Sequence, residues 1–528
     1  MRIRRFVLGV IVFLSVLVGC TEKISDPGDD VVGIELTNPG EGDLLNGIVT
    51  LRAEVMERSE VSQVEFFIDG DTLGIDTEAP YEVEWNTETA VNDIHSLVCR
   101  GILENSEEVF ADTLLVTVRN LLFTVNYIDW LEEDDTSYVY VSDHEGNILG
   151  EAGWTGNGII EVEHSPVNGL IPERVTVTIV HNFSVLSTFF AIPKGSVWTY
   201  KDDNLPVDSH PVILDFQNVP ENEGYLLSSL WQASLSNSSL GESRTLYFPE
   251  GPSDLYIRLK TEEFGNKYKW VYDITGDSCE VDLAEMSNTD STIIELDYVP
   301  DDLSYSLIGY PIPGSHKTNS GYYLDFNLGY DSVTSSITLR YPPDDFTDYK
   351  TDITFYDGND HNTSWSETFY GAIPESVSRY EVEYDLISNE PDNFIMQVTG
   401  DCDKVTIQWY SSESEVYWNV TGPPDYFDFT FPTPPVSVFE NMPDLDMGMM
   451  EMYFVTLINY SPCESYDEVI YLNFNSDEYF YDAIYGYRSR KIYFGTNKEL
   501  LNRQIDAEGY KIFFDEREDE LLRKRLGR

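Results

Sequence analysis

Two short acidic segments carry the residue types that could bind a divalent metal ion. Their clustered aspartates and asparagine are Asp344, Asp345 and Asp348 in the first segment, and Asp357, Asn359 and Asp360 in the second. Hard oxygens at short spacing are the ligands that Ca²⁺ prefers. Neither segment follows the EF-hand pattern, however, and Asp- and Asn-rich loops are also ordinary turns in β-proteins. Calcium is therefore one hypothesis for these loops, and no other cofactor is expected.

Covalent and zinc-dependent hydrolysis leave recognisable motifs, and this sequence contains neither. A serine nucleophile on a tight turn would read GxSxG, and a helical zinc site would read HExxH. Both strings are absent, and the seven histidines are scattered. Glycoside hydrolysis needs only two carboxylates across a cleft, and with 94 acidic residues the sequence leaves that reaction open. A protein without catalytic residues is favoured, with a carbohydrate-active enzyme as the alternative.

One aromatic row has the spacing of a binding platform. Tyr268, Trp270 and Tyr272 alternate along the chain, so in a strand they share one face. An exposed row could stack on sugar rings, because tyrosine and tryptophan combine a flat apolar surface with a polar edge. Lys267 and Lys269 would then lie on the opposite, wet face, which favours the simpler interpretation that the row is core.

The charge of the chain excludes one class of partner. The formal net charge is −62 over 528 residues. Such a chain repels phosphate backbones, so nucleic-acid binding is not expected. Dispersed carboxylates usually form a solvated surface, and this is the interpretation that we favour over cation binding.

The first 20 residues read as an export signal. Arg2, Arg4 and Arg5 precede an apolar run at 6–19, which is too short for a transmembrane helix and typical of a signal peptide. The run ends in Leu-Val-Gly before Cys20, which resembles the lipobox of bacterial lipoproteins. The resemblance implies cleavage before Cys20 and acylation of that cysteine, including palmitate, which anchors the chain to a membrane. Thr21 fits the outer membrane, with the chain facing the periplasm or the cell surface. Residues 21–31 are polar and read as a flexible tether.

Residues 32–120 carry the pattern of a β-sandwich. Val64, Phe66 and Ile68 alternate along one expected strand, and Asp69-Gly70 then supplies a hairpin turn. The strings VEFFIDGDTLGIDTEAPYEVEWNT, HSLVCRGI and LLVTVRN resemble a bacterial Ig-like domain. That resemblance implies a spacer or adhesive module, although a fold alone does not fix an activity.

The remaining residues keep the β pattern. Runs such as ERVTVTIVHNF and DKVTIQWY alternate, Pro and Gly punctuate them, and no long helical period interrupts them. We predict an all-β, multi-domain fold, with two or three β-sandwich-like units after the Ig-like domain. The predicted segments are 121–300, 301–435, and an aromatic-rich 436–528 that ends in a short helix.

Two pairs of similar strings suggest internal duplication. TFFAIPKGSVWTY, from Thr188, resembles TFYGAIPESVSRY, from Thr368, and DITGDSCEVDLAE resembles QVTGDCDKVTIQW. The second pair would place Cys279 and Cys402 at equivalent positions. The disulfide pairing of these two cysteines with Cys99 and Cys463 stays open.

Together these features predict a lipid-anchored cell-envelope protein that binds or adheres without catalysis. A glycan or a surface protein is the expected partner, and the membrane is contacted through the lipid on Cys20. A carbohydrate-active enzyme and a purely structural envelope component are the alternatives.

Overall fold

The described chain is almost entirely β-structure, which confirms the predicted all-β, multi-domain fold. A computed structural model describes residues 33–494, apart from 57–60, 129–134, 166–169, 202–208, 231–232, 237, 250, 262–264, 312–320, 328–334, 344–345, 347, 358–362, 391–392, 426, 430–432, 475–483 and 485. Two compact units divide the chain, one of residues 1–87 and 93–119 and the other of residues 88–92 and 120–528.

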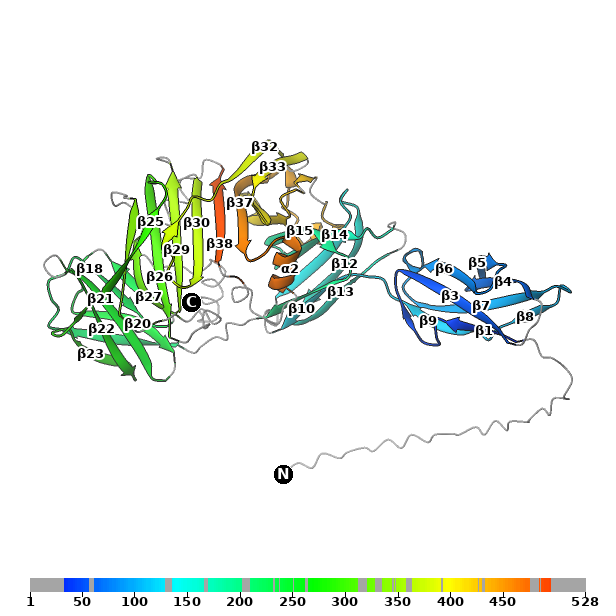
Figure 1. Cartoon of the computed structure of the whole chain (residues 1–528), viewed down its shortest axis with the longest axis horizontal. Helices are drawn as coiled ribbons and strands as arrows, with labels where there is room; N and C mark the ends of the chain where they lie inside the picture. The colour runs from blue at the N-terminus through cyan, green and yellow to red at the C-terminus, as the bar shows by residue number, and fades with distance from the viewer. Residues whose placement is uncertain are drawn as a thin grey trace, which may run out of the picture. The chain divides into compact units, whose positions relative to one another are not determined.

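The first unit contains the predicted Ig-like sandwich (Figure 1). One sheet has the order β1 (Gly33–Asn38), β3 (Ile48–Met56) and β6 (Tyr81–Asn86). The other has the order β2 (Leu44–Leu45), β9 (Leu114–Val118), β7 (Ile94–Leu103), β4 (Val61–Ile68) and β5 (Asp71–Asp76), with β8 (Glu108–Phe110) beside β7.

The core of this domain lies between its two sheets. Leu51 and Trp85 from the smaller sheet are buried, as are Phe66 and Cys99 from the larger one. The residues that alternate with Phe66 and Cys99 therefore face outward from the larger sheet. The expected hairpin turn joins β4 to β5, with positive φ at Asp69 and at Gly70.

A seven-strand pattern occurs three times in the second unit, and we call these segments the first, second and third repeats. The first repeat consists of β10 (Leu121–Ile128), β11 (Thr136–Ser142), β12 (Ile148–Thr155), β13 (Gly158–Glu163), β14 (Arg174–His181), β15 (Val185–Pro193) and β16 (Ser196–Lys201). The second consists of β17 (Ser209–Gln217), β18 (Gly224–Ser228), β19 (Ala233–Ser236), β20 (Ser243–Pro249), β21 (Ser253–Thr261), β22 (Gly265–Ile274) and β23 (Ser278–Asp282). The third consists of β25 (Asp290–Leu296), β26 (Asp302–Tyr310), β27 (Tyr322–Asn327), β28 (Ser336–Tyr341), β29 (Asp348–Asp357), β30 (Thr363–Gly371) and β31 (Ser376–Val377). In each repeat the first strand is central in a three-stranded sheet, antiparallel to the fourth strand and parallel to the seventh. The other four strands form the opposing sheet, which in the second repeat also carries β24 (Ser287–Asn288).

A fourth group of seven strands completes the unit, and we call it the fourth repeat although its strand order differs: its first, second and fifth strands form an antiparallel three-stranded sheet with the first strand at the edge. Its strands are β32 (Val382–Glu390), β33 (Asn393–Gly400), β34 (Lys404–Ser411), β35 (Val416–Gly422), β36 (Asp428–Phe429), β37 (Glu451–Ser461) and β38 (Gly486–Tyr493). The described helices of this region are α1 (Val436–Asn441) and α2 (Tyr466–Phe474), together with one 3-10 turn (Met447–Met449). The division of this unit into the predicted segments 121–300, 301–435 and 436–528 stays a prediction.

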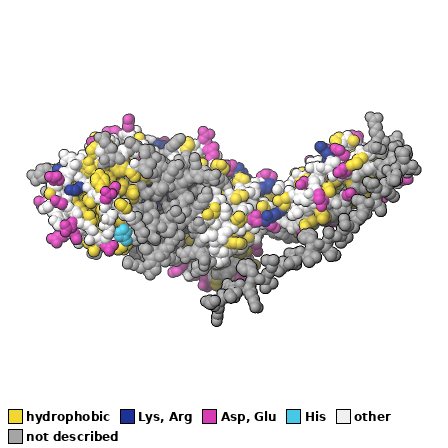
Figure 2. All heavy atoms as spheres, turned by 90° about the horizontal axis from the view of Figure 1, so that it is seen from below, with side chains coloured by type: hydrophobic (Ala, Val, Ile, Leu, Met, Phe, Trp, Pro, Cys, Tyr) yellow, Lys and Arg dark blue, Asp and Glu magenta, His cyan; other side chains and the backbone are white. Residues whose placement is uncertain are grey.

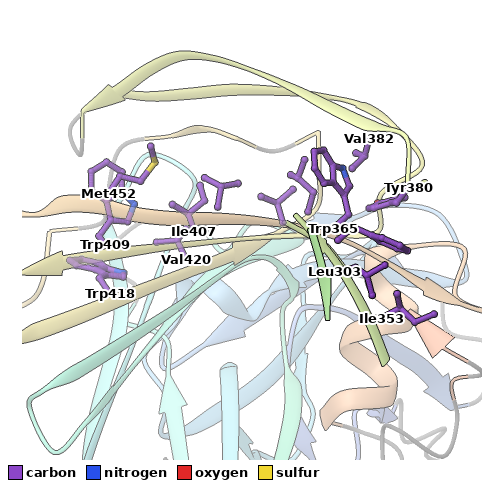
Figure 3. Close-up of a cluster of buried hydrophobic side chains, with 14 of the residues drawn as sticks. Leu303, Ile353, Trp365, Tyr380, Val382, Ile407, Trp409, Trp418, Val420 and Met452 are labelled. Atoms are coloured by element: carbon purple, nitrogen blue, oxygen red, sulfur yellow. The ribbon is translucent and has the colours of Figure 1, made fainter. Parts of the chain in front are cut away.

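Three of the four repeats share one twelve-stranded sheet. Its order is β12-β11-β14-β15-β35-β34-β37-β38-β30-β29-β26-β27, so the fourth repeat joins the first to the third. Strand β35 pairs in parallel with β15, and β38 pairs antiparallel with β30. Leu303 and Trp365 of the third repeat lie in one buried cluster with Ile407 and Trp409 of the fourth (Figure 3).

The strand positions agree with the first of the two internal similarities and not with the second. The strings from Thr188 and Thr368 lie on β15–β16 and β30–β31, which are the last two strands of the first and third repeats. The other pair falls on β22–β23 and β33–β34, which occupy different places in their repeats. Cys279 and Cys402 are therefore not equivalent, and the four cysteines of the described chain are free thiols.

Candidate binding surface

The aromatic row on β22 faces away from the core of its own sandwich. Val271, which points the other way, packs against that core. Tyr268 and Trp270 are half-buried against the cluster of the neighbouring repeat instead, and the Trp270 ring centroid lies 4.8 Å from that of Tyr322 on β27. Only Tyr272, 62% exposed, ends the row in solvent. The row therefore joins two repeats and offers one exposed ring, so its role in glycan stacking stays a prediction.

The structure describes one residue of each acidic segment. Asp348 begins β29 and Asp357 ends it, so these two residues are about 30 Å apart along the strand. The other predicted ligands, Asp344, Asp345, Asn359 and Asp360, lie outside the described residues. Within the described ranges, no group of three or more His, Cys, Asp or Glu could hold a metal ion. Calcium binding stays a prediction for two separate loops.

The predicted lipidation site, Cys20, also lies outside the described residues. Among the helices that the structure describes, none has the length and apolarity needed to cross a bilayer. The lipid on Cys20 stays a prediction of the sequence.

A polar surface lies on β35, β34, β37, β38, β30 and β29 of the twelve-stranded sheet, on the side that faces away from the cluster in Figure 3. Ile407 and Val455 point into that cluster, so their neighbours along β34 and β37 point outward. We call this surface the polar face, and its residues are Thr354, Ser364, Ser366, Ser489, Lys491, Phe454, Thr456, Thr406, Gln408, Asn419 and Thr421. Most of these side chains are half-buried.

Hydrogen bonds between neighbouring strands order the side chains of the polar face. The Gln408 amide donates to Asn419 Oδ1 at 2.8 Å, and the hydroxyls of Thr406 and Thr421 are 3.2 Å apart. A further hydroxyl pair on β29 and β30, Thr354 and Ser366, is 2.9 Å apart. Such pairs hold donors and acceptors in fixed positions, which lowers the entropy lost when a partner binds.

Few carboxylates lie on this side of the sheet, although the chain carries 94 acidic residues: Asp352 alternates with Thr354 on β29, and Glu451 lies opposite Tyr410, beside Gln408. The Asp352 carboxylate accepts a hydrogen bond from Thr368 Oγ1 at 2.7 Å and pairs with the Lys350 ammonium at 3.1 Å. At the centre of the polar face lies the Lys491 ammonium, 4.0 Å from the centroid of the Phe454 ring. Acidic side chains, by contrast, are scattered over the described surface in the space-filling view (Figure 2). The centre of the polar face therefore carries little charge, with Asp352 and Glu451 at its edges.

Helix α2 bounds the polar face on one side. Val469 and Leu472 of the helix pack with Ile458 and Tyr460 of β37. Lys404 lies at this border with its ammonium 5.0 Å from the Tyr460 ring, and burial lowers the pKa of this lysine to about 8. The helix thus covers the apolar end of this sheet surface and leaves the hydroxyl- and amide-bearing part outside its contacts.

A shallow cavity of about 310 Å³ lies beside the first turns of α2. Its lining includes Cys463, Glu468 and Tyr471. Burial is the main cause that raises the pKa of the Cys463 thiol to about 11. Because thiolates rather than thiols are nucleophiles, this shift disfavours nucleophilic reaction of Cys463 at neutral pH.

The sequence did not reveal the polar face. Alternation in DKVTIQWY shows that Thr406 and Gln408 share one side of a strand. It does not show that strands from 348 to 493 assemble side by side, because that order depends on pairing between repeats.

Comparisons with known proteins support the Ig-like assignment of the first domain. Residues 33–98 match the family model described as "Bacterial Ig domain", which confirms the predicted resemblance, and the rest of the chain has no family match. A search of curated proteins finds no match to the chain.

The search of solved structures finds matches with low TM-scores, among them the following three. The fibronectin(III)-like modules of Clostridium thermocellum CbhA are 22% identical, with 16% of this chain and 93% of that chain covered and a TM-score of 0.15. The Bacillus anthracis TIE protein is 9% identical, with 66% and 74% covered and a TM-score of 0.18. SGBP-B of the Bacteroides ovatus mixed-linkage glucan utilization locus, solved in complex with a mixed-linkage heptasaccharide, is 9% identical, with 60% and 93% covered and a TM-score of 0.15.

Proposed function

We propose that the protein is a lipid-anchored, non-catalytic binding protein of the bacterial cell envelope, and that the polar face recognises a glycan. The row of hydrogen-bonded hydroxyl and amide side chains on this face is the observation that carries the proposal. A surface whose centre is made of hydroxyls and amides can exchange its water for the hydroxyls of a neutral sugar without desolvating a carboxylate there. Another surface protein is the second candidate partner.

Recognition is tested with a glycan panel. The chain from residue 21 onward is offered neutral and acidic polysaccharides, with and without calcium. We expect saturable binding to a neutral polysaccharide that is insensitive to salt, because no ion pair carries it. Binding restricted to envelope protein extracts would replace the glycan by a protein partner. Shortened sugar products would move the assignment to the carbohydrate-active enzyme, and no binding would leave the structural role.

Two variants locate the binding surface. Gln408→Ala removes a side chain from the middle of the polar face and leaves the Asn419 amide without its partner. Gln217→Ala removes an exposed glutamine of β17, outside that face, and serves as the matched control. We expect Gln408→Ala to weaken glycan binding about tenfold, a typical loss for a polar contact in an ordered site, and the control to bind like the native chain. Equal affinities would exclude the polar face.

The lipid anchor is tested separately by metabolic labelling. The full-length chain should incorporate labelled palmitate and partition with the outer membrane, whereas Cys20→Ser should lose both label and membrane attachment. Retention of the variant in the membrane fraction would contradict lipidation at Cys20.

A further inference from the structure

The larger sheet of the Ig-like domain exposes an apolar surface to solvent. Five large side chains are about half exposed or more, namely Leu44 (62%), Ile75 (54%), Ile94 (63%), Phe110 (57%) and Leu115 (47%). Isolated exposed apolar residues are normal on soluble proteins, whereas several on one sheet face mark a surface that contacts a partner.

Strand register places these five residues on the same side of the sheet. Leu44 and Ile94 are both opposite Thr117 of β9, and Leu115 follows two residues away on that strand. At the other end of the sheet, one row of paired residues runs from Phe110 through Arg100 and Glu65 to Ile75. We call this surface the apolar Ig face.

The charges of the apolar Ig face are neutralised within it. The Arg100 guanidinium pairs with Glu65, and its second ion pair reaches Glu108 at 3.2 Å. The same guanidinium lies over the rings of Phe67 and Phe110, at 5.3 and 5.8 Å from their centroids. A partner therefore meets apolar side chains and an ion cluster that is already satisfied.

We infer that the apolar Ig face binds the same face of a second copy of this chain in the plane of the membrane. The inference rests on the proposed lipid anchor. Residues 21–32 separate Cys20 from the start of β1, a span that reaches at most about 40 Å. Every anchored copy then keeps its Ig-like domain within about 40 Å of the membrane, which raises the effective concentration of identical faces for one another. Acidic charge elsewhere keeps copies apart, so association concentrates on the face where apolar burial outweighs repulsion.

The test measures association at controlled surface density. The chain from residue 21 carries an N-terminal histidine tag and is held on nickel-chelating phosphatidylcholine vesicles. Energy transfer between donor- and acceptor-labelled copies should exceed the value for randomly placed molecules. It should rise with added salt, because salt screens the repulsion between acidic copies and leaves apolar contacts intact.

Two variants test whether the apolar Ig face, and not another surface of the domain, carries the association. The double variant Ile94→Glu, Leu115→Glu should lose the excess transfer, because its carboxylates face each other across the contact. Ile48→Glu, at a residue of β3 that is 70% exposed, should keep it. Thermal unfolding of both variants verifies the fold. Transfer at the random value in the native chain, or an equal loss in the control, would overturn the inference.

A lipid surface as the true partner would give a different result. Untagged chain would then sediment with phosphatidylcholine vesicles, and this outcome also overturns the inference. Because the tag replaces the lipid, failure of lipidation at Cys20 would appear only in the labelling experiment.

Discussion

In the Ig-like domain, two sheets close around one core, whereas three of the four repeats that follow share a single sheet. Trp85 packs between sheets of its own domain, but Trp418 of the fourth repeat donates its indole hydrogen to Thr188 of the first, at 2.8 Å. This difference in architecture should determine how far the effect of a substitution spreads when each region unfolds. A change in the Ig-like domain should stay local, and a change in the long sheet should reach repeats far away in sequence.

The largest effect on stability is expected when one buried tryptophan is removed from each region. Trp85→Ala and Trp418→Ala each delete a buried ring and should cost about 3–5 kcal/mol. Hydrogen exchange should then accelerate in β3 and β7 for the first variant, and in β15, β34 and β35 together for the second. Exchange that accelerates only in β35 after Trp418→Ala would show that the shared sheet does not unfold as one unit.

Ion pairs provide a second contrast between the regions. Arg258 of the second repeat and Asp325 of the third are 2.6 Å apart, and their side chains are 11% and 1% exposed. Asp325 also accepts the backbone N–H groups of Phe326 and Arg340. Asp325→Ala should cost about 3–5 kcal/mol, because it leaves a buried guanidinium without its counter-charge.

The matched control is an exposed pair of the Ig-like domain. Arg52 and Glu82 are 2.6 Å apart with side chains 51% and 31% exposed, so Glu82→Ala should cost less than about 1 kcal/mol. Urea unfolding measures both variants. Similar losses would mean that the second and third repeats do not depend on their buried pair.

The same contrast explains what the sequence could predict. Strand alternation and turn residues are local, so the all-β fold and the hairpin at Asp69-Gly70 could be read directly. The resemblance of the first domain was equally local and was confirmed. The row at Tyr268, Trp270 and Tyr272 shared one face as expected, but alternation does not reveal which repeat covers that face. Pairing of β35 with β15 joins residues more than 200 positions apart, and no local pattern encodes it.

A pH effect should distinguish the long sheet from the Ig-like domain. Glu367 of β30 is 1% exposed, and burial raises its pKa to about 7, although Arg488 at 3.2 Å lowers it and Asp297 raises it further. In the unfolded chain this carboxyl ionises near pH 4.5. Between pH 4.5 and 7 the Glu367 carboxyl is therefore ionised in the unfolded state but still protonated in the folded state. The free energy of unfolding falls as the pH rises through this range, by roughly 3 kcal/mol in total.

Glu367→Gln removes this titration. The variant should lose the slope between pH 4.5 and 7 and should be more stable than the native chain at pH 8. Urea midpoints across this range, followed by exchange in β30, measure the effect. An unchanged slope in Glu367→Gln would assign the pH dependence to other carboxyls.

The smallest predicted effect on stability falls on the polar face, and it separates folding from function. Gln408 contacts Asn419 on the solvent side of the sheet, so Gln408→Ala should change the unfolding free energy by only about 0.5 kcal/mol. If the polar face binds a glycan, the same substitution should weaken binding by a larger free energy, because an ordered donor is lost where the sugar contacts the sheet. Isothermal titration and urea unfolding on one preparation compare the two values. A stability loss larger than the binding loss would mean that this amide supports the sheet and does not recognise a ligand.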